Sequence, residues 1–122
     1  RVLPGSEEHF REEVARIVGD GVDIEWTWQP PLEFPFEGDL VEAMKAALLV
    51  EDPDGTAVPY MLSGGTDNKA FARLGIAGYG FSPLRLPADL DFTSLFHGVD
   101  ERVPVDALTF GTRVLDRFLR SC

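Results

Sequence analysis

One histidine and two acidic residues form the first group that could do chemistry. His97 stands in a loop-like stretch and is followed closely by Asp100 and Glu101. Imidazole is a common zinc ligand, and its second nitrogen needs an acceptor that fixes the tautomer. Zinc takes three or four protein ligands, so His97 alone makes no metal site. Taken by itself it is more simply a surface or hydrogen-bonded histidine.

A glycine-containing turn over Ser63–Asp67 is the second candidate. Gly65 would let the backbone approach a ligand closely, and the start of the helix that follows favours an anion. The simpler interpretation is a turn whose serine or threonine caps that helix. Arg1 could bind a carboxylate, although a terminal arginine is normally only solvated.

Composition narrows the classes of function. The 122 residues hold 11 Lys and Arg against 21 Asp and Glu, a net charge of −10, which argues against a nucleic-acid partner and against an anionic membrane surface. Apolar residues make up 44%, enough for a core, and no apolar run approaches the ~20 residues of a spanning helix. Cys122 is the only cysteine, so we expect no internal disulfide and a cytoplasmic protein.

The candidate residues need elements that position them, and hydrophobic periodicity predicts an alternation of helices and strands. Helices are expected after Ser6, after an N-cap at Asp39, around residues 70–74 and from Pro104. The last helix should bury a stripe made of Leu108, Gly111, Leu115, Phe118 and Leu119. Strands are expected at 22–28, 58–62 and 76–81. This pattern predicts an α/β chain, and the prolines within residues 29–36 mark a domain boundary.

Three stretches in this order resemble the end of a zinc amidohydrolase. They are PYMLSGGTDNKAF at 59–71, YGFSP at 79–83 and FHGVDERV at 96–103. The family is that of aminoacylase, acetylornithine deacetylase, succinyl-diaminopimelate desuccinylase and the glutamate and Gly-X carboxypeptidases. The opening RVLPG also resembles the strand and turn of the family's lid domain. The resemblance spans essentially the whole chain and is specific to the superfamily, but not to one activity.

The resemblance implies a two-domain organisation. Residues 1–30 would be the second half of a ferredoxin-like α+β lid that makes a homodimer. Residues 31–122 would be the C-terminal part of a sheet-and-helix catalytic domain, which in the complete enzyme holds two zinc ions, with cobalt or manganese as alternative metals. Because the chain opens on Arg-Val-Leu without a methionine, we expect an earlier part to be missing.

The resemblance also assigns roles to individual residues. His97 matches the family's last metal ligand, and Asp100 and Glu101 match the acidic pair that would hold the loop and the histidine. The family's other metal ligands and its general-base glutamate are expected upstream.

The substrate pocket follows from the same resemblance. Gly65 and Thr66 match the turn that holds the substrate carboxylate, and Arg1 matches the lid arginine that binds the same group.

The expected function is therefore a fragment of a zinc-dependent amidohydrolase. The complete enzyme would cleave the amide bond of dipeptides or N-acyl amino acids with a free carboxylate, and the YGFSP and HGVDER forms favour a peptidase over a deacylase. The fragment alone should be inactive. One alternative is a non-catalytic dimerisation or interaction module that keeps a remnant of the fold. The other is an unrelated α/β binding domain.

Overall fold

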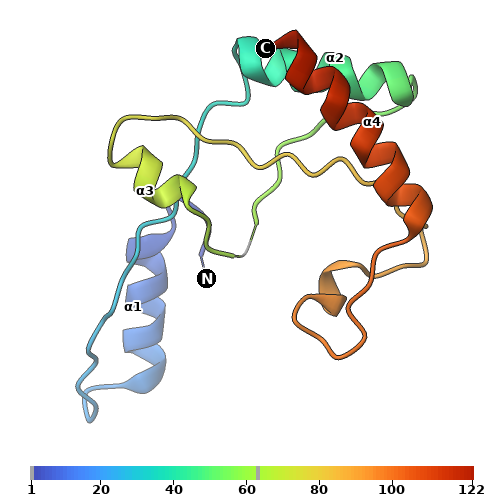
Figure 1. The fold of residues 1–122 in the computed structure, drawn as a ribbon. Coiled ribbons are helices and arrows are strands. Elements are labelled where there is room, and N and C mark those ends of the chain that lie inside the picture. Colours follow the sequence, from blue (N-terminus) through green and yellow to red (C-terminus); the bar gives the residue numbers. More distant parts are fainter. Residues whose placement is uncertain (1, 63) are drawn as a thin grey trace. The chain divides into compact units, whose positions relative to one another are not determined.

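The structure is a computed structural model that describes residues 2–62 and 64–122 (Figure 1). Its helices are α1 (Glu7–Val18), α2 (Asp39–Glu51), α3 (Asn68–Ala72), the 3-10 helix η1 (Thr93–Leu95) and α4 (Val105–Ser121). The chain divides into two compact units that alternate along the sequence. The first consists of Arg1–Pro35 and Tyr60–Tyr79, and the second of Phe36–Pro59 and Gly80–Cys122. The domain boundary at residues 30 and 31 stays a prediction.

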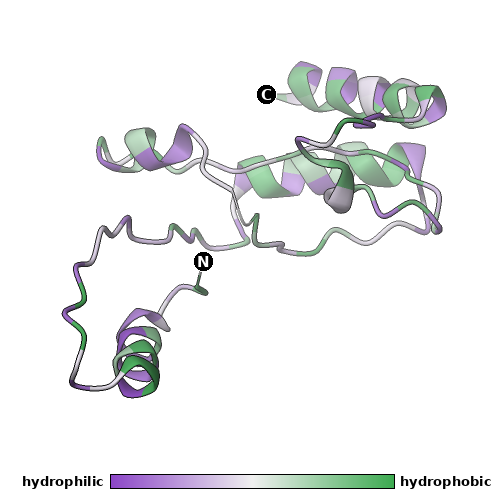
Figure 2. Ribbon diagram, turned by 90° about the horizontal axis from the view of Figure 1, so that it is seen from below, coloured by the Kyte–Doolittle hydropathy of each residue, from purple (hydrophilic) through white to green (hydrophobic). Residues whose placement is uncertain are grey.

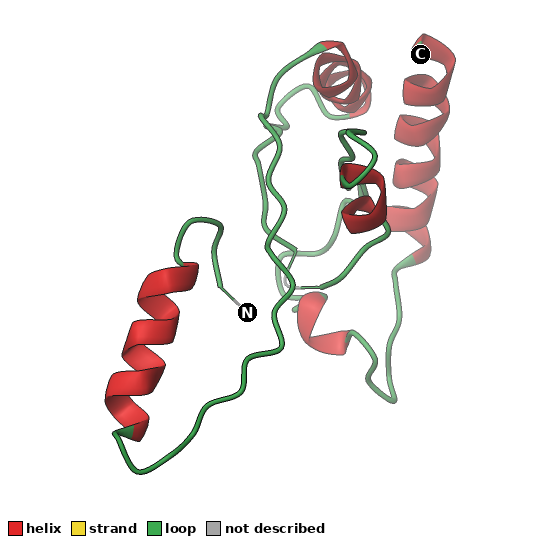
Figure 3. Cartoon of the chain, turned by 90° about the vertical axis from the view of Figure 1, so that its left-hand side faces the viewer, coloured by secondary structure: helices red, strands yellow, loops and turns green. Residues whose placement is uncertain are grey.

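The expectation of an α/β fold is wrong. The described residues contain helices and no strand (Figure 3), so neither the ferredoxin-like half-lid nor the sheet-and-helix arrangement is present in them. The segments 22–28, 58–62 and 76–81 run as irregular chain. A strand needs a neighbour that takes its backbone N–H and C=O groups. No backbone hydrogen bond joins any of these three segments to another extended segment.

All four α-helices that the sequence predicts are confirmed. Ser6 takes the N-cap position of α1, although its side chain makes no capping hydrogen bond. Gly19 ends this helix with a φ of 76°, a conformation that glycine adopts without steric penalty. Helix α2 begins one residue earlier than expected, because Gly38 rather than Asp39 takes the N-cap position.

The first unit is held by aromatic contacts beside α1. Phe10 packs edge to face with Trp26, with ring centres 6.2 Å apart. The Arg11 guanidinium lies over the rings of Trp26 and Trp28, 4.8 Å from the centre of the latter, as in a cation–π contact. The described residues of this unit include none that is buried. The described part of this unit therefore has no buried hydrophobic core.

A second set of contacts in the first unit involves Tyr79 and its neighbour Gly78, which contact the chain at Phe34–Pro35 and the start of α3. The Tyr79 hydroxyl donates to the Pro35 carbonyl over 3.0 Å, and its ring lies 6.0 Å from that of Phe34. Asn68, the first residue of α3, lies directly against Gly78, where a Cβ would stand 2.4 Å from the Asn68 Oδ1 atom. Gly78 thus leaves room for the side-chain amide of Asn68.

The second unit contains the buried residues of the described chain. Helices α2 and α4 pack on each other, and apolar and polar residues alternate along both ribbons in Figure 2. The buried apolar side chains are Val41, Ala47, Ala107, Phe110 and Val114. The stripe expected on α4 is therefore wrong in part: Gly111 is buried and Phe118 is half-buried, but Leu108, Leu115 and Leu119 are exposed.

A close backbone contact positions α4 in this unit. The Pro83 carbonyl lies against Gly111, so close that a Cβ on Gly111 would stand 2.6 Å from that oxygen. Phe81, from the same segment, packs edge to face with Phe118, with ring centres 5.6 Å apart. The segment 81–83 is thereby fixed against α4 at two points.

An ion-pair network reinforces the contact between α2 and α4. The Glu51 carboxylate accepts hydrogen bonds from the Nε atoms of Arg117 and Arg113, at 2.6 and 2.9 Å. The Glu51 side chain is only 11% exposed. The hydrogen bond from Arg117 lowers the pKa of Glu51 below its ordinary value; partial burial opposes this shift, and the charges of Arg117 and Arg113 add to it.

Substituting Gly111 by alanine should destabilise the second unit. Alanine favours a helix over glycine by about 1 kcal/mol, but the clash is with the backbone at Pro83, which cannot swing aside. We expect a net loss of about 1–3 kcal/mol in the free energy of unfolding, the usual range for overpacking. Urea unfolding measures it. Gly80→Ala is the matched control, since a Cβ there meets nothing within 4 Å; equal stability of the two variants would contradict the packing argument.

The Glu51 network should make stability depend on pH. Because folding lowers the pKa of Glu51, its contribution is complete above the unfolded-state pKa of about 4.3 and is lost as the pH falls through the lowered folded-state value. Glu51→Gln should lower the melting temperature at pH 7, and the difference from the unchanged chain should shrink below about pH 4. Glu42→Gln is the control, because Glu42 pairs with Lys45 within α2. A difference that stays constant from pH 7 to pH 3 would rule out this linkage.

Candidate functional site

His97 lies where η1 ends and the chain turns towards α4. Its φ is 60°, and among the described residues it is the only non-glycine residue with a positive φ. This left-handed conformation is uncommon for a residue with a Cβ and persists where the surrounding contacts impose it. Backbone strain of this kind is concentrated at functional sites, which makes the residue a candidate on structural grounds as well.

The contacts that impose this conformation come from the loop itself. The backbone N–H of His97 donates to Oε2 of Glu101 over 3.1 Å. On the other side, the N–H of Gly98 donates to the Leu95 carbonyl over 2.9 Å. A Cβ on Gly98 would stand 3.1 Å from that same carbonyl, so the turn is tight as well as closed. The backbone of His97 is thus held from both sides while its side chain is exposed.

The two acidic residues have different partners. Glu101 binds the backbone of His97 rather than its imidazole ring. Asp100 forms an ion pair with Arg102, and the same Arg102 Nη1 atom also donates to the Asp100 carbonyl over 2.9 Å. Asp100 therefore stabilises the exit of the loop, and Glu101 stabilises its centre.

The described residues do not by themselves form a metal site. Nowhere in them do three or more His, Cys, Asp or Glu side chains come together as a set that could hold a metal ion. His97 offers one ligand, while His9, the second histidine, lies in α1 of the first unit. Two or three further ligands are needed for zinc.

The predicted carboxylate turn belongs to the first unit. Gly65 and Thr66 are both exposed, and a Cβ on Gly65 would meet nothing within 4 Å. The carbonyl of Thr66 accepts from the Lys69 N–H over 3.2 Å, which leads the chain into α3. The turn leaves open space at Gly65, as a ligand-binding turn requires. Arg1, and Ser63 at the start of the turn, lie outside the described residues.

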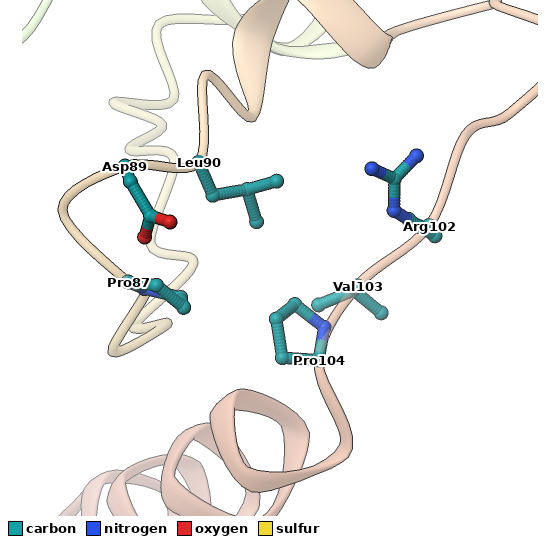
Figure 4. A pocket seen from close by; sticks show the side chains of 6 residues that line it. All are labelled: Pro87, Asp89, Leu90, Arg102, Val103 and Pro104. Carbon is teal, nitrogen blue, oxygen red and sulfur yellow. The ribbon is translucent and has the colours of Figure 1, made fainter.

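Sequence reasoning missed a hollow beside the His97 loop. Its volume is about 440 Å³, and it is lined by Pro87, Asp89, Leu90, Arg102, Val103 and Pro104 (Figure 4). It lies within the second unit, between the segment that leads to η1 and the start of α4. The sequence gives little indication of this hollow, because its charged residues Asp89 and Arg102 and its two prolines belong to no recognisable motif.

Comparisons with protein-family models, with curated proteins and with solved structures give no match to this chain. In the part of the chain that the structure describes, no helix has the length and apolar character needed to cross a membrane.

Proposed function

We propose that the chain is part of a zinc-dependent amidohydrolase that cleaves dipeptides or N-acyl amino acids with a free carboxylate. In this proposal His97 supplies one metal ligand, and Gly65 and Thr66 form part of the pocket for the substrate carboxylate. The support is the resemblance of three ordered motifs together with the geometry of His97. A peptidase is favoured over a deacylase by the same motifs.

The observation that carries the proposal is the conformation of His97. Its strained backbone is held by Glu101 and by the turn at Gly98, while the imidazole stays accessible. These contacts fix the backbone from which the imidazole projects, and a binding side chain is best presented from a rigid backbone.

The proposal leaves most of the chemistry to residues outside this chain. Bound zinc, or alternatively cobalt or manganese, would activate the water that attacks the amide. The general base and the remaining ligands are expected upstream, so this chain alone should not hydrolyse substrate. The proposal also keeps a homodimer formed through residues 1–30 and a cytoplasmic location, the latter resting on the single cysteine.

The competing proposal is a non-catalytic dimerisation or interaction module. It is favoured by the apolar side chains that the first unit leaves exposed, among them Ile17, Val22 and Leu74. The two proposals differ in what His97 does, because only the enzyme needs its imidazole to bind a metal.

A zinc titration of the chain, followed by NMR of the imidazole ring signals, tests the role of His97. We expect weak binding that perturbs the His97 ring, since one imidazole cannot make a closed site. His97→Ala should abolish this response, and His9→Ala should preserve it. In the polypeptide that also carries the remaining ligands, His97→Ala should lose one of two metal ions and most activity. Two retained metals with unchanged kcat would refute the proposal and favour the interaction module.

Gly65→Val tests the carboxylate turn in the same longer polypeptide. Because a Cβ at Gly65 meets no protein atom within 4 Å, the melting temperature should hardly change. A bulky side chain would instead fill the space needed by the substrate, so kcat/KM for substrates with a free carboxylate should fall at least tenfold. Gly21→Val, equally open and in the same unit, is the matched control. Equal losses on acid and amidated substrates would remove the carboxylate role.

A further inference from the structure

The hollow beside the His97 loop is a depression that is open to solvent, and its volume is about 440 Å³. Ligand pockets in proteins usually measure about 300–1,000 Å³. Two short segments of the second unit form its walls. One carries Pro87, Asp89 and Leu90, and the other carries Arg102, Val103 and Pro104 (Figure 4).

Both walls are held by local structure. The N–H of Leu90 donates to the Pro87 carbonyl over 3.1 Å, which closes the turn that presents Asp89. On the other wall, the Pro104 carbonyl accepts from the N–H of Leu108 over 3.2 Å, so this wall continues into α4. Proline fixes φ at both places. A site with fixed walls binds a ligand without a large cost in ordering.

The charges in the hollow have opposite signs and stand on opposite walls (Figure 4). Among the described residues, no ion pair or side-chain hydrogen bond engages Asp89. Arg102 binds Asp100 through Nη1 alone, which leaves its Nε and Nη2 donors without a partner in the same part of the chain. The remaining lining consists of Leu90, Val103 and the two prolines, which are apolar.

We infer that this hollow binds a small zwitterion with an apolar body, of the class of free aliphatic amino acids. The ligand's ammonium group pairs with Asp89, its carboxylate accepts from Arg102, and its side chain packs on Leu90 and Val103. Charge-assisted hydrogen bonds of this kind are roughly twice as strong as neutral ones. A simple anion would be repelled by Asp89 and a simple cation by Arg102, so a ligand with both charges fits best.

This inference does not rest on the zinc proposal. His97 is not among the residues that line the hollow, and no residue of the hollow is assigned to the metal or to the carboxylate turn. An experiment can therefore contradict zwitterion binding while zinc binding through His97 is confirmed. It can equally contradict zinc binding while zwitterion binding is confirmed.

The test is a titration of the chain with three related probes, followed by backbone amide NMR. L-leucine carries both charges, N-acetyl-L-leucine lacks the ammonium group and L-leucinamide lacks the carboxylate. We expect saturable binding of leucine that shifts the amide signals of residues 88–90, 102, 103 and 105, the positions of the two walls that carry a backbone N–H. Each blocked derivative should bind at least tenfold more weakly.

Two substitutions assign each charge to its wall. Asp89→Asn should weaken leucine at least tenfold but strengthen the binding of N-acetyl-L-leucine, because the charge that repels this anion is gone. Arg102→Gln should weaken leucine to the same extent and strengthen the binding of the L-leucinamide cation for the corresponding reason. Asp89→Glu keeps the charge and should retain leucine binding, and Asp54→Asn, an exposed acid in the same unit, is the neutral control.

Three outcomes would overturn the inference. They are the absence of saturable leucine binding, equal binding of leucine and its blocked derivatives, and an unchanged leucine affinity in Asp89→Asn. Unchanged melting temperatures of the variants establish that any loss of binding is not a loss of folding.

Discussion

The close contact between the Pro83 carbonyl and Gly111 is the constraint on which the second unit depends. It allows α4 to lie against the incoming chain with no side chain between them. Once α4 is placed, its partner α2 is fixed through the core around Val114 and through the Glu51 ion pairs. The start of the same helix sets the position of Pro104. The exit of the His97 loop and one wall of the hollow follow from there.

The helices could be predicted from the sequence because their signals are local. Apolar spacing of three and four residues identifies all four, supported by local end signals such as Gly19 after α1 and Pro104 before α4. The strands could not be predicted correctly, because alternation of side chains in a segment such as 22–28 reports which residues could share a face. It does not report whether another backbone lies at hydrogen-bonding distance. That information is not contained in any short window of residues.

The face that α4 buries shows a finer limit. The helix carries two adjacent apolar stripes, one containing Ala107 and Val114 and the other containing Leu108 and Leu115. Helical periodicity alone permits either stripe to face inward. Gly111 was placed on the buried face by its position, and the reason that a glycine is needed there became clear only from the approach of Pro83.

The candidate site was predictable in part for similar reasons. The residue types and their order draw attention to His97 and the two acids after it. Neither the left-handed backbone of His97 nor the choice of its backbone N–H as the partner of Glu101 follows from their spacing. Asp89 and Arg102 were not singled out, because they come together only through the path of the chain around η1.

The irregular segment 22–28 has a consequence for the behaviour of many copies together. Its backbone groups are not paired with another segment, and Val22 and Trp26 are exposed beside them, so both backbone and apolar groups are available for contact with another copy. A net charge of −10 keeps copies apart by mutual repulsion. Salt shortens the reach of that repulsion to about 8 Å at physiological ionic strength. The colloidal stability of the protein is therefore expected to fall as the ionic strength of its surroundings rises.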